Sequence, residues 1–372
     1  MPSKPFFRAD QVGSLLRPPE LLAARARRAE GGIDDAALHA AEDAAIADAV
    51  AKQEKAGLPV VMDGEFRREN FWIDFIRGIE GLTIAGADDV ASFSNSPAGA
   101  TRYAPKWARA TGKIRPTRVQ MKDDYEYLAG LTDRAVKVTV PSPTRAHVLS
   151  GDKAADPDVY PDIDDYWDDL AGVYRAEIAG LEALGCRYIQ IDEPYFSSFI
   201  DDKQRAHLEE IHGPTDPLIA RYVEVLNECV RERSPKTNVA LHICRGNARS
   251  TWFASGGYGA IADSVLAKID VDSLLLEYDD ERSGDFAPLA RIKPDVTVVL
   301  GLITTKSGAM EDGAALKARI RDATPYVPLE RLAVSPQCGF ASVAEGNLLS
   351  EDDQWKKLAL TVETAQAVWG TA

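Results

Sequence analysis

Short runs of β-branched and other apolar residues alternate along this chain with longer stretches of helix-forming composition. Each apolar run ends in a polar turn. Strands that are apolar almost without interruption are typical of a parallel sheet buried on both faces. We therefore predict eight strands, at residues 8–13, 59–65, 136–140, 188–192, 238–242, 273–277, 296–301 and 331–335.

The stretches between these runs predict helices. Residues 21–55 are rich in Ala, Glu and Arg, which are strong helix formers, so we expect them to be helical. Residues 80–130 differ, because Gly, Ser and Thr interrupt the pattern, and we interpret them as a hairpin-like excursion inserted between the second and third strands. Further helices are expected at residues 163–184, 216–233, 260–268, 309–323 and 352–368.

Eight strand–helix units in one chain predict an α/β fold of the TIM (β/α)8 barrel class. A doubly wound parallel sheet is the alternative, and it would normally carry a Gly-rich phosphate loop after an early strand. The sequence has no such loop. It also has no linker rich in Pro, Gly and Ser, so we expect residues 1–372 to form a single catalytic domain.

The bulk composition and net charge limit which classes of molecule the protein can bind. Of the 372 residues, 45% are hydrophobic and 27% are charged, which is ordinary for a soluble globular protein. A formal net charge of -15 argues against nucleic acid or an anionic membrane as a partner, because both need a basic face. No run approaches the roughly 18 apolar residues of a membrane span, and the first residues lack the apolar core of a signal peptide. We therefore expect a cytoplasmic protein.

Polar residues gather where the predicted strands end. In a TIM barrel the catalytic groups lie at the carboxyl ends of the strands. Each such residue alone could be structural: Asp192 a helix cap, Glu65 a surface charge, His242 a core histidine. Their convergence on one rim favours a shared site instead. The residues are Gly13, Ser14, Glu65, Asp192, His242, Cys244, Glu277, Lys306 and Cys338.

A metal centre is predicted within this set. His242 and Cys244 lie two residues apart at a strand end, where residues two apart point to the same side. Glu277 and Cys338 each follow a further apolar run. Two thiolates and an imidazole favour Zn²⁺ over magnesium or calcium, which take oxygen ligands. Because the ligands are dispersed and Cys-x-x-Cys knuckles are absent, we predict one open, catalytic zinc site rather than a structural one.

The charge of such a centre indicates its chemistry. Zinc with two thiolates and one carboxylate is too electron-rich to activate water well. An added thiol would lose its proton there and remain nucleophilic, so the centre favours alkylation of a thiol. A zinc hydrolase and a barrel that zinc only stabilises are the alternatives. Removing the zinc would unfold the stabilised barrel, but it would leave a catalytic barrel folded and inactive.

Six short segments together carry a family resemblance over most of the chain: Val12–Pro18, Asp63–Glu65, Ile189–Pro194, His242–Asn247, Glu277–Asp279 and Gln337–Gly339. With them, the chain resembles the catalytic barrel of cobalamin-independent methionine synthase in its short, single-barrel form. The resemblance implies a zinc-dependent methyltransferase of methionine biosynthesis. Such an enzyme moves a methyl group from a donor to the thiol of homocysteine through a zinc-bound thiolate.

The resemblance also implies roles for positions of this chain. The amino group of homocysteine would meet the carboxylates of Asp192 and Glu65, because an ammonium needs acceptors. Its carboxylate would meet the Ser14 hydroxyl and backbone N–H groups near Gly13. The implied metal ligands are His242, Cys244, Glu277 and Cys338, and further candidates for binding substrate are Arg245 and Asn247.

Three departures from the family pattern concern the methyl donor. The second, N-terminal barrel of the longer enzymes has no counterpart in this sequence. Pro141-Ser142-Pro143 stands where the family's pterin-stacking tryptophan is expected, and Lys306 stands at the place of its proton-donating histidine. The donor could be a folate held differently, a methyl-corrinoid or another small methylated compound. The alternative function is alkyl transfer to another thiol, as in epoxyalkane:coenzyme M transferases.

Asp192 and Lys306 are the candidates for catalytic residues. A lysine, with a pKa of about 10.4, is a weak acid at neutral pH. We therefore expect Lys306 to act as a fixed positive charge that steers an anionic donor or stabilises developing negative charge. A solvated loop lysine is the alternative. The expected partners are homocysteine and a methyl donor, without nucleic acid or membrane, and a homo-oligomer remains open.

Overall fold

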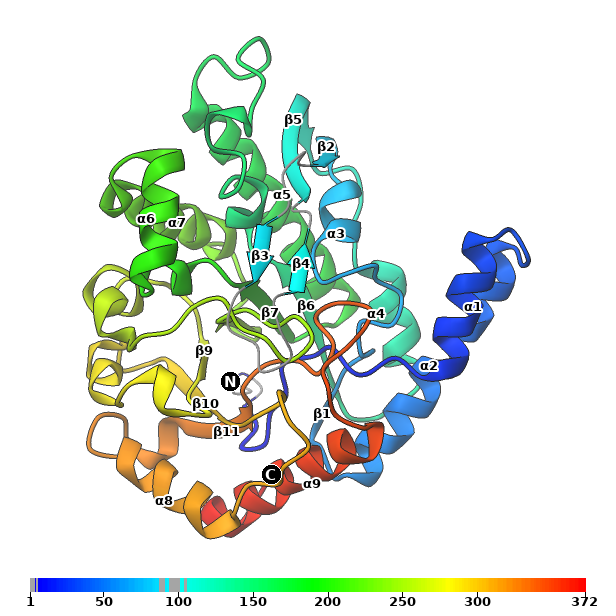
Figure 1. Cartoon of the computed structure of the whole chain (residues 1–372), viewed down its shortest axis with the longest axis vertical. Coiled ribbons are helices and arrows are strands. Elements are labelled where there is room, and N and C mark those ends of the chain that lie inside the picture. The colour runs from blue at the N-terminus through cyan, green and yellow to red at the C-terminus, as the bar shows by residue number, and fades with distance from the viewer. Residues whose placement is uncertain (1–3, 5, 87–90, 94–100, 104–105) are drawn as a thin grey trace.

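A curled sheet of seven parallel strands forms the centre of the molecule, and helices cover its outer side (Figure 1). The computed structural model describes residues 4, 6–86, 91–93, 101–103 and 106–372. Hydrogen-bonded neighbours follow the order β1-β6-β7-β8-β9-β10-β11, as expected for successive strand–helix units. The strands are β1 Val60–Val61, β6 Ala135–Pro141, β7 Tyr188–Glu193, β8 Asn238–Ile243, β9 Ser273–Glu277, β10 Thr297–Ile303 and β11 Leu332–Pro336.

The predicted first strand, residues 8–13, is not a strand of this sheet. Its backbone pairs with Val334 of β11 through two hydrogen bonds of 2.9 Å, which form an isolated bridge. Towards β1, a side chain replaces backbone pairing, because the Gln11 amide donates to Val60 O at 3.0 Å. The sheet is therefore a curled half-barrel that contains seven of the eight predicted strands.

The helices follow the predicted pattern with two corrections. Residues 21–55 form two helices rather than one, because Gly31 adopts a left-handed φ of 74° just after the first helix ends. Residues 260–268 form a 3-10 turn and a π turn, Tyr258–Ile261 and Ala262–Leu266, in place of an α-helix. Three nearby glycines lower the helix propensity there. The α-helices are α1 Pro19–Ala29, α2 Asp35–Lys55, α3 Ile73–Arg77, α4 Lys122–Ala129, α5 Ile163–Leu184, α6 Asp202–His212, α7 Thr215–Val230, α8 Gly313–Ala323 and α9 Glu351–Trp369.

Two antiparallel strand pairs lie outside the main sheet, between β1 and β6 in the chain. They fall within the region predicted as an excursion, of which residues 87–90, 94–100 and 104–105 lie outside the described residues. Within the described part of the chain, no helix has both the length and the apolar character needed to cross a membrane. The pairs are β2 Glu80–Gly86 with β5 Lys106–Arg115, and β3 Ala91–Phe93 with β4 Thr101–Tyr103.

A small apolar cluster with contributions from most strands of the sheet packs inside the curl. Burial of an aliphatic side chain of this kind contributes about 1.5–3 kcal/mol, so the cluster stabilises the curled form. Beside it lie three buried polar residues, and one of them, Lys137, donates hydrogen bonds to the other two, Asp10 and Gln190. The cluster consists of Val12, Val60, Tyr188, Ala240, Leu275, Val299 and Ala333.

Candidate metal centre

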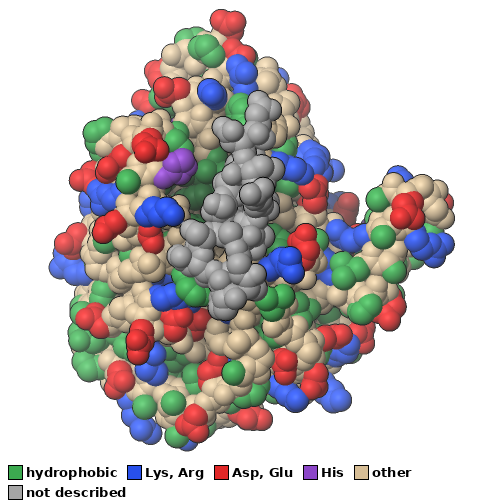
Figure 2. All heavy atoms as spheres, viewed as in Figure 1, with side chains coloured by type: hydrophobic (Ala, Val, Ile, Leu, Met, Phe, Trp, Pro, Cys, Tyr) green, Lys and Arg blue, Asp and Glu red, His purple; other side chains and the backbone are tan. Residues whose placement is uncertain are grey.

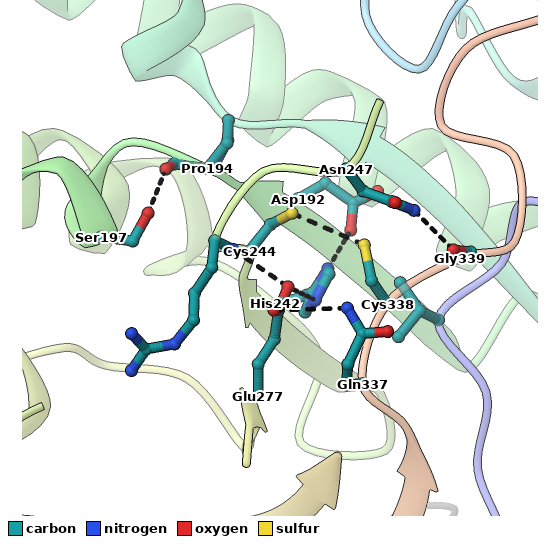
Figure 3. Close-up of polar contacts among 12 residues, drawn as sticks. Asp192, Pro194, Ser197, His242, Cys244, Asn247, Glu277, Gln337, Cys338 and Gly339 are labelled. Carbon is teal, nitrogen blue, oxygen red and sulfur yellow. Dashed lines mark hydrogen bonds and ion pairs between the residues drawn. The ribbon is translucent and has the colours of Figure 1, made fainter. Parts of the chain in front are cut away.

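Four side chains from three strand ends converge at the carboxyl edge of the sheet (Figure 3). One ligand atom of each of His242, Cys244, Glu277 and Cys338 lies within 4.8 Å of those of the others. The two thiol sulfurs are 3.5 Å apart, and His242 Nε2 is 3.8 Å from Glu277 Oε1. A tetrahedral zinc ion with ligands at about 2.0–2.3 Å requires ligand separations of about 3.3–3.8 Å. The group therefore fits one tetrahedral ion.

The imidazole of His242 is aimed at this group. Its Nδ1 lies 3.1 Å from Asp192 Oδ1. Its Nε2 is buried and has no hydrogen-bond partner among the residues that the structure describes. An unpartnered buried nitrogen costs free energy unless a ligand satisfies it. Nε2 is therefore the atom that would bind a metal, with Asp192 as the outer partner that orients the ring.

Glu277 is held in place by neighbours on both carboxylate oxygens. The Arg245 N–H donates to Oε1 at 2.9 Å, and the Gln337 amide donates to Oε2 at 3.4 Å. Gln337 in turn accepts hydrogen bonds from the N–H and hydroxyl of Thr305, at 2.9 and 2.6 Å. Gln337 is a supporting residue that the strand-end rule did not single out, although it precedes Cys338 in the sequence.

The electrostatics of the group indicate an excess of negative charge. A hydrogen bond from the Cys244 thiol lowers the pKa of Cys338, and that shared proton raises the pKa of Cys244 well above its ordinary value. Burial lowers the pKa of His242, but Asp192, Cys338 and Glu277 outweigh burial and raise it to about 9. A divalent cation would relieve this crowding of acidic groups, so the charges fit a metal as well as the distances do.

A cavity of about 290 Å³ lies next to the metal group. Four of the residues predicted to contact substrate line it: Ser14, Glu65, Asp192 and Asn247. On the face shown in Figure 2, acidic and basic side chains are interspersed, so the net charge of -15 is not concentrated in one patch there. The cavity can therefore receive a small charged molecule through local contacts.

Glu65 has features typical of a functional residue. Its φ of 60° is unusual for a residue other than glycine, and such strain is found preferentially at functional sites. Burial raises its pKa, Arg68 opposes that rise, and the nearby Asp192 and Asp63 add to it. Within the part of the chain that the structure describes, Gln190 and His242 both bond to Oδ1 of Asp192, so Oδ2 is left for a ligand. Two facing carboxylates of this kind suit an ammonium group.

Close packing around Ser14 explains two glycines of the predicted site. A Cβ at position 339 would lie 1.9 Å from the Ser14 hydroxyl. A Cβ at position 13 would lie 2.8 Å from the Met62 methyl group, and Gly13 has a φ of 145°. Glycine therefore suits both positions, because a side chain at position 339 would push aside Ser14, which lines the cavity, and position 13 also has a backbone conformation that favours glycine.

Four predicted residues lie outside the cavity lining: Gly13 and Glu277, described above, and the cations Arg245 and Lys306. The Arg245 guanidinium is fully buried 4.4 Å from the Tyr258 ring and donates to Gly256 O at 2.7 Å. The Lys306 ammonium lies 3.3 Å from Gly246 O and 3.4 Å from the Thr251 carbonyl and the Asn247 side chain. Both cations hold the loop that follows β8. They could therefore influence a substrate only by positioning that loop or through long-range electrostatic interaction.

The structure adds residues that the sequence did not reveal. Trp72, Arg145 and Tyr195 line the cavity, and the Arg145 guanidinium lies 3.6 Å from the centre of the Trp72 ring. These residues come from connecting segments, where no strand-end rule applies. For the two aromatic residues, the only signal in the sequence is their position soon after a strand, as in Phe71-Trp72 after Asp63-Gly64-Glu65.

Comparison with known proteins gives one consistent result. Residues 7–366 match the family model described as the catalytic domain of cobalamin-independent synthase. The chain is 40% identical to the uncharacterized protein YxjH of Bacillus subtilis, over 98% of this chain and 95% of that protein. It is similar to a structure of a putative vitamin-B12 independent methionine synthase from Listeria monocytogenes, with a TM-score of 0.77, 32% identity and full coverage of both chains.

A longer enzyme matches over only part of its length. The 5-methyltetrahydropteroyltriglutamate–homocysteine methyltransferase of Rhodococcus jostii is 24% identical over 91% of this chain, but the match spans 41% of that enzyme.

Proposed function

The chain belongs to the cobalamin-independent methionine synthase family of methyltransferases, and we propose that it transfers a methyl group to the sulfur of homocysteine. The observation that carries the proposal is the tetrahedral group beside a cavity whose wall presents two carboxylates. A thiol would enter at the metal group, and an amino group on the same molecule would meet the carboxylates. Homocysteine has both groups.

The four residues of the group, His242, Cys244, Glu277 and Cys338, are proposed to hold Zn²⁺. Two sulfurs, an imidazole nitrogen and a carboxylate match the ligands that zinc prefers over harder cations. When bound, zinc supplies a Lewis acid that favours the thiolate form of a substrate thiol. The thiol proton would pass to solvent, the sulfur would supply the electron pair of its new bond to the methyl carbon, and the donor would leave with the electron pair of the bond that breaks.

Protein residues would orient the amino acid. Glu65 and the Oδ2 atom of Asp192 are proposed to accept hydrogen bonds from the substrate ammonium. The Ser14 hydroxyl and nearby backbone N–H groups would donate to its carboxylate. Asn247 lines the same cavity and donates to Gly339 O at 2.7 Å, so it would hold this wall in position.

Lys306 is proposed to act as a fixed positive charge. Its charge is a small contribution that favours the ionised form of both thiols. It opposes the hydrogen bond with Cys338 and the burial that raise the pKa of Cys244, and it adds to the hydrogen bond that lowers the pKa of Cys338. Lys306→Arg should keep at least about half of the turnover, whereas Lys306→Met should lower it about 10-fold, consistent with the loss of one electrostatic contact. Turnover rates at matched zinc content test this. A Met variant as active as the parent would leave Lys306 without a chemical role.

We further propose that the chain acts as a single-domain barrel. The support is the segment at residues 8–13, which pairs with β11 through its backbone and reaches β1 through Gln11. Such contacts would close the curl and bring Ser14 to the same rim as the metal group.

The decisive experiment is an assay of the purified protein with homocysteine and a panel of methyl donors. The panel contains methyltetrahydrofolate with one and three glutamates, methylcobalamin, and a small methylated sulfonium compound. Methionine formation with any donor supports the proposal and identifies the donor class. Cysteine and coenzyme M, offered with the same donors and with an epoxide, test the acceptor. Alkylation of coenzyme M without any methionine formation would overturn the proposal.

A further inference from the structure

A chain of buried polar groups connects the interior of the sheet to the metal group. Lys137 Nζ lies 2.9 Å from Gln190 Oε1, and Gln190 Nε2 lies 2.7 Å from Asp192 Oδ1. The same oxygen of Asp192 lies 3.1 Å from His242 Nδ1. The four side chains are buried, with exposed fractions of 1%, 0%, 8% and 2% in this order. Because the four residues are buried, their protein neighbours determine which atom of each contact donates the hydrogen bond.

The Gln190 amide is fixed in one orientation from both of its ends. The Lys137 ammonium can only donate, and it also contacts Asp10 Oδ1 at 2.7 Å. Gln190 must then turn its carbonyl oxygen to Lys137. Its NH₂ group meets two acceptors, Val12 O at 2.8 Å and Asp192 Oδ1 at 2.7 Å. A flipped amide would place oxygen against both acceptors and nitrogen against the ammonium, losing all three hydrogen bonds.

This orientation propagates to His242. An ionised Asp192 only accepts, so Nδ1 of His242 must carry the proton, and Nε2 keeps its lone pair. Nε2 is the buried nitrogen without a partner in the described part of the chain, and it faces Glu277 Oε1 at 3.8 Å. An imidazole binds a metal through its unprotonated nitrogen, and the hydrogen bond on the other nitrogen selects which one that is.

We infer that Gln190 is a positioning residue, held by Lys137, that fixes Asp192 and thereby the His242 tautomer that presents Nε2 to a metal ion. The amide keeps Oδ1 of Asp192 beside the imidazole and leaves Oδ2 for the cavity. Without it, the Asp192 carboxylate is free to turn wholly towards a bound ammonium and release the histidine. The inference rests on the proposed function only in that the group of four residues holds a metal.

The first test replaces the amide with an apolar side chain of similar length, Gln190→Met. Zinc affinity is measured by competition with a chromophoric chelator, and we expect a loss of about 10-fold, the lower end for outer-shell partners of metal ligands. In metal-free protein labelled with ¹⁵N-histidine, at an alkaline pH where the imidazole is neutral, the parent should show His242 protonated at Nδ1, and the variant a mixture of tautomers. Parental zinc affinity together with an unchanged tautomer would overturn the inference.

The control is a second fully buried lysine. Lys357 lies on α9, and its ammonium is 2.9 Å from the Glu311 carboxylate. Lys357→Met should change thermal stability without changing zinc affinity. If it lowered zinc affinity as much as Gln190→Met, the effect would be general destabilisation, and the inference would fail.

The second test asks whether Lys137 acts through Gln190. Lys137→Met is combined with Asp10→Asn, because Asp10 would otherwise keep an unpaired buried charge. This pair should lower zinc affinity in the parent and add nothing further in the Gln190→Met background. Additive losses would show that Lys137 acts by another route. If the parent binds zinc and the variants show the predicted losses, but the parent forms no methionine, the proposed function is refuted and this inference stands.

Discussion

The two walls of the cavity are built from different parts of the chain. The strand-end wall takes its side chains from positions at or just past the carboxyl ends of the sheet strands. The loop wall takes its side chains from the connections after β1, β6 and β7. The strand-end wall includes Glu65, Asp192, His242, Cys244 and Cys338, and the loop wall includes Asn70, Phe71, Trp72, Arg145, Leu149, Tyr195 and Leu208.

The contacts within the walls differ as well. In the strand-end wall, carboxylate, imidazole and thiol groups bond to one another and to the sheet, as Asp192 does with His242 and Gln190. In the loop wall, aromatic and aliphatic surfaces dominate, and the clearest contact is Arg145 stacked on Trp72. Sites on strands hold geometry more tightly than sites on loops, whereas loops vary more readily. We therefore expect the strand-end wall to carry the thiol chemistry and the loop wall to select the methyl donor.

The largest effect is expected from a substitution in the metal group of the strand-end wall. Cys338→Ala removes one anionic ligand, so zinc affinity should fall more than about 100-fold and methyl transfer should become undetectable. Zinc content by atomic emission and methionine formation are the measurements. Cys186→Ala is the matched control, because Cys186 is equally buried but lies outside the cavity lining. Full zinc occupancy and turnover in the Cys338 variant would remove it from the ligand set.

A smaller effect is expected at the substrate end of the same wall. Glu65→Gln keeps the size of the side chain but removes a charged acceptor from the substrate ammonium, which costs about 2 kcal/mol or more and raises KM for homocysteine about 30-fold. Zinc content should not change, because Glu65 is not among the four residues of the metal group. With 4-mercaptobutanoate, which lacks the amino group, parent and variant should perform alike. An unchanged KM for homocysteine would place the ammonium elsewhere.

Much of the strand-end wall could be predicted from the sequence, since parallel strands that are apolar throughout end at one edge. His242 and Cys244, two apart after such a run, necessarily share a side. Glu277 ends β9, which pairs with both β8 and β10, and Cys338 follows β11, which pairs with β10. The pattern of apolar runs and the residues that end them was therefore sufficient to predict that these four side chains meet, although they span nearly 100 residues of the chain.

What could not be predicted depends on contacts between side chains distant in sequence. The first predicted strand is reduced to one bridge because Gln11 takes up the carbonyl of Val60, and no pattern reveals such a substitution. Lys137 looks like a surface residue between two valines, yet its charge is buried against Asp10. Lys306 was placed on the rim by its position in the chain, whereas the orientation of its ammonium depends on the fold of the loop after β8.

The loop wall should respond in the opposite way to the strand-end wall. Trp72→Leu removes aromatic surface, and the loss of such a contact is worth about 1 kcal/mol. We expect KM for the methyl donor to rise about 5-fold, while zinc content and KM for homocysteine stay at parental values. Trp167→Leu is the control, because Trp167 is a buried tryptophan outside the cavity lining. A change in the KM for homocysteine alone would contradict the assignment of methyl-donor selection to the loop wall.

The smallest expected effect concerns the packing behind the loop wall. His147 follows Arg145 by two residues and lies against His212 and Trp167, with ring centroids 5.1 and 4.7 Å away. Burial, with a smaller contribution from His212, lowers the pKa of His147 to about 3. Because this folded pKa lies below the unfolded value, the unfolded chain takes up the proton first as pH falls. His147 therefore leaves stability unchanged above pH 6.5 and destabilises the fold progressively from there down to about pH 3.

At pH 5.5 the loss attributable to His147 is about 1.4 kcal/mol, since one pH unit below the unfolded pKa corresponds to that free energy. His147→Gln keeps a hydrogen-bonding partner for Tyr222, which lies 3.0 Å from His147 Nδ1, but it cannot take up the proton. Urea unfolding at pH 7.5 and 5.5 should show a smaller drop in unfolding free energy for the variant than for the parent. His39→Gln, at an exposed position on α2, should retain the parental drop. Equal drops in all three proteins would mean that His147 is protonated as readily in the fold as in the unfolded chain, and that the loop wall is open to water from behind.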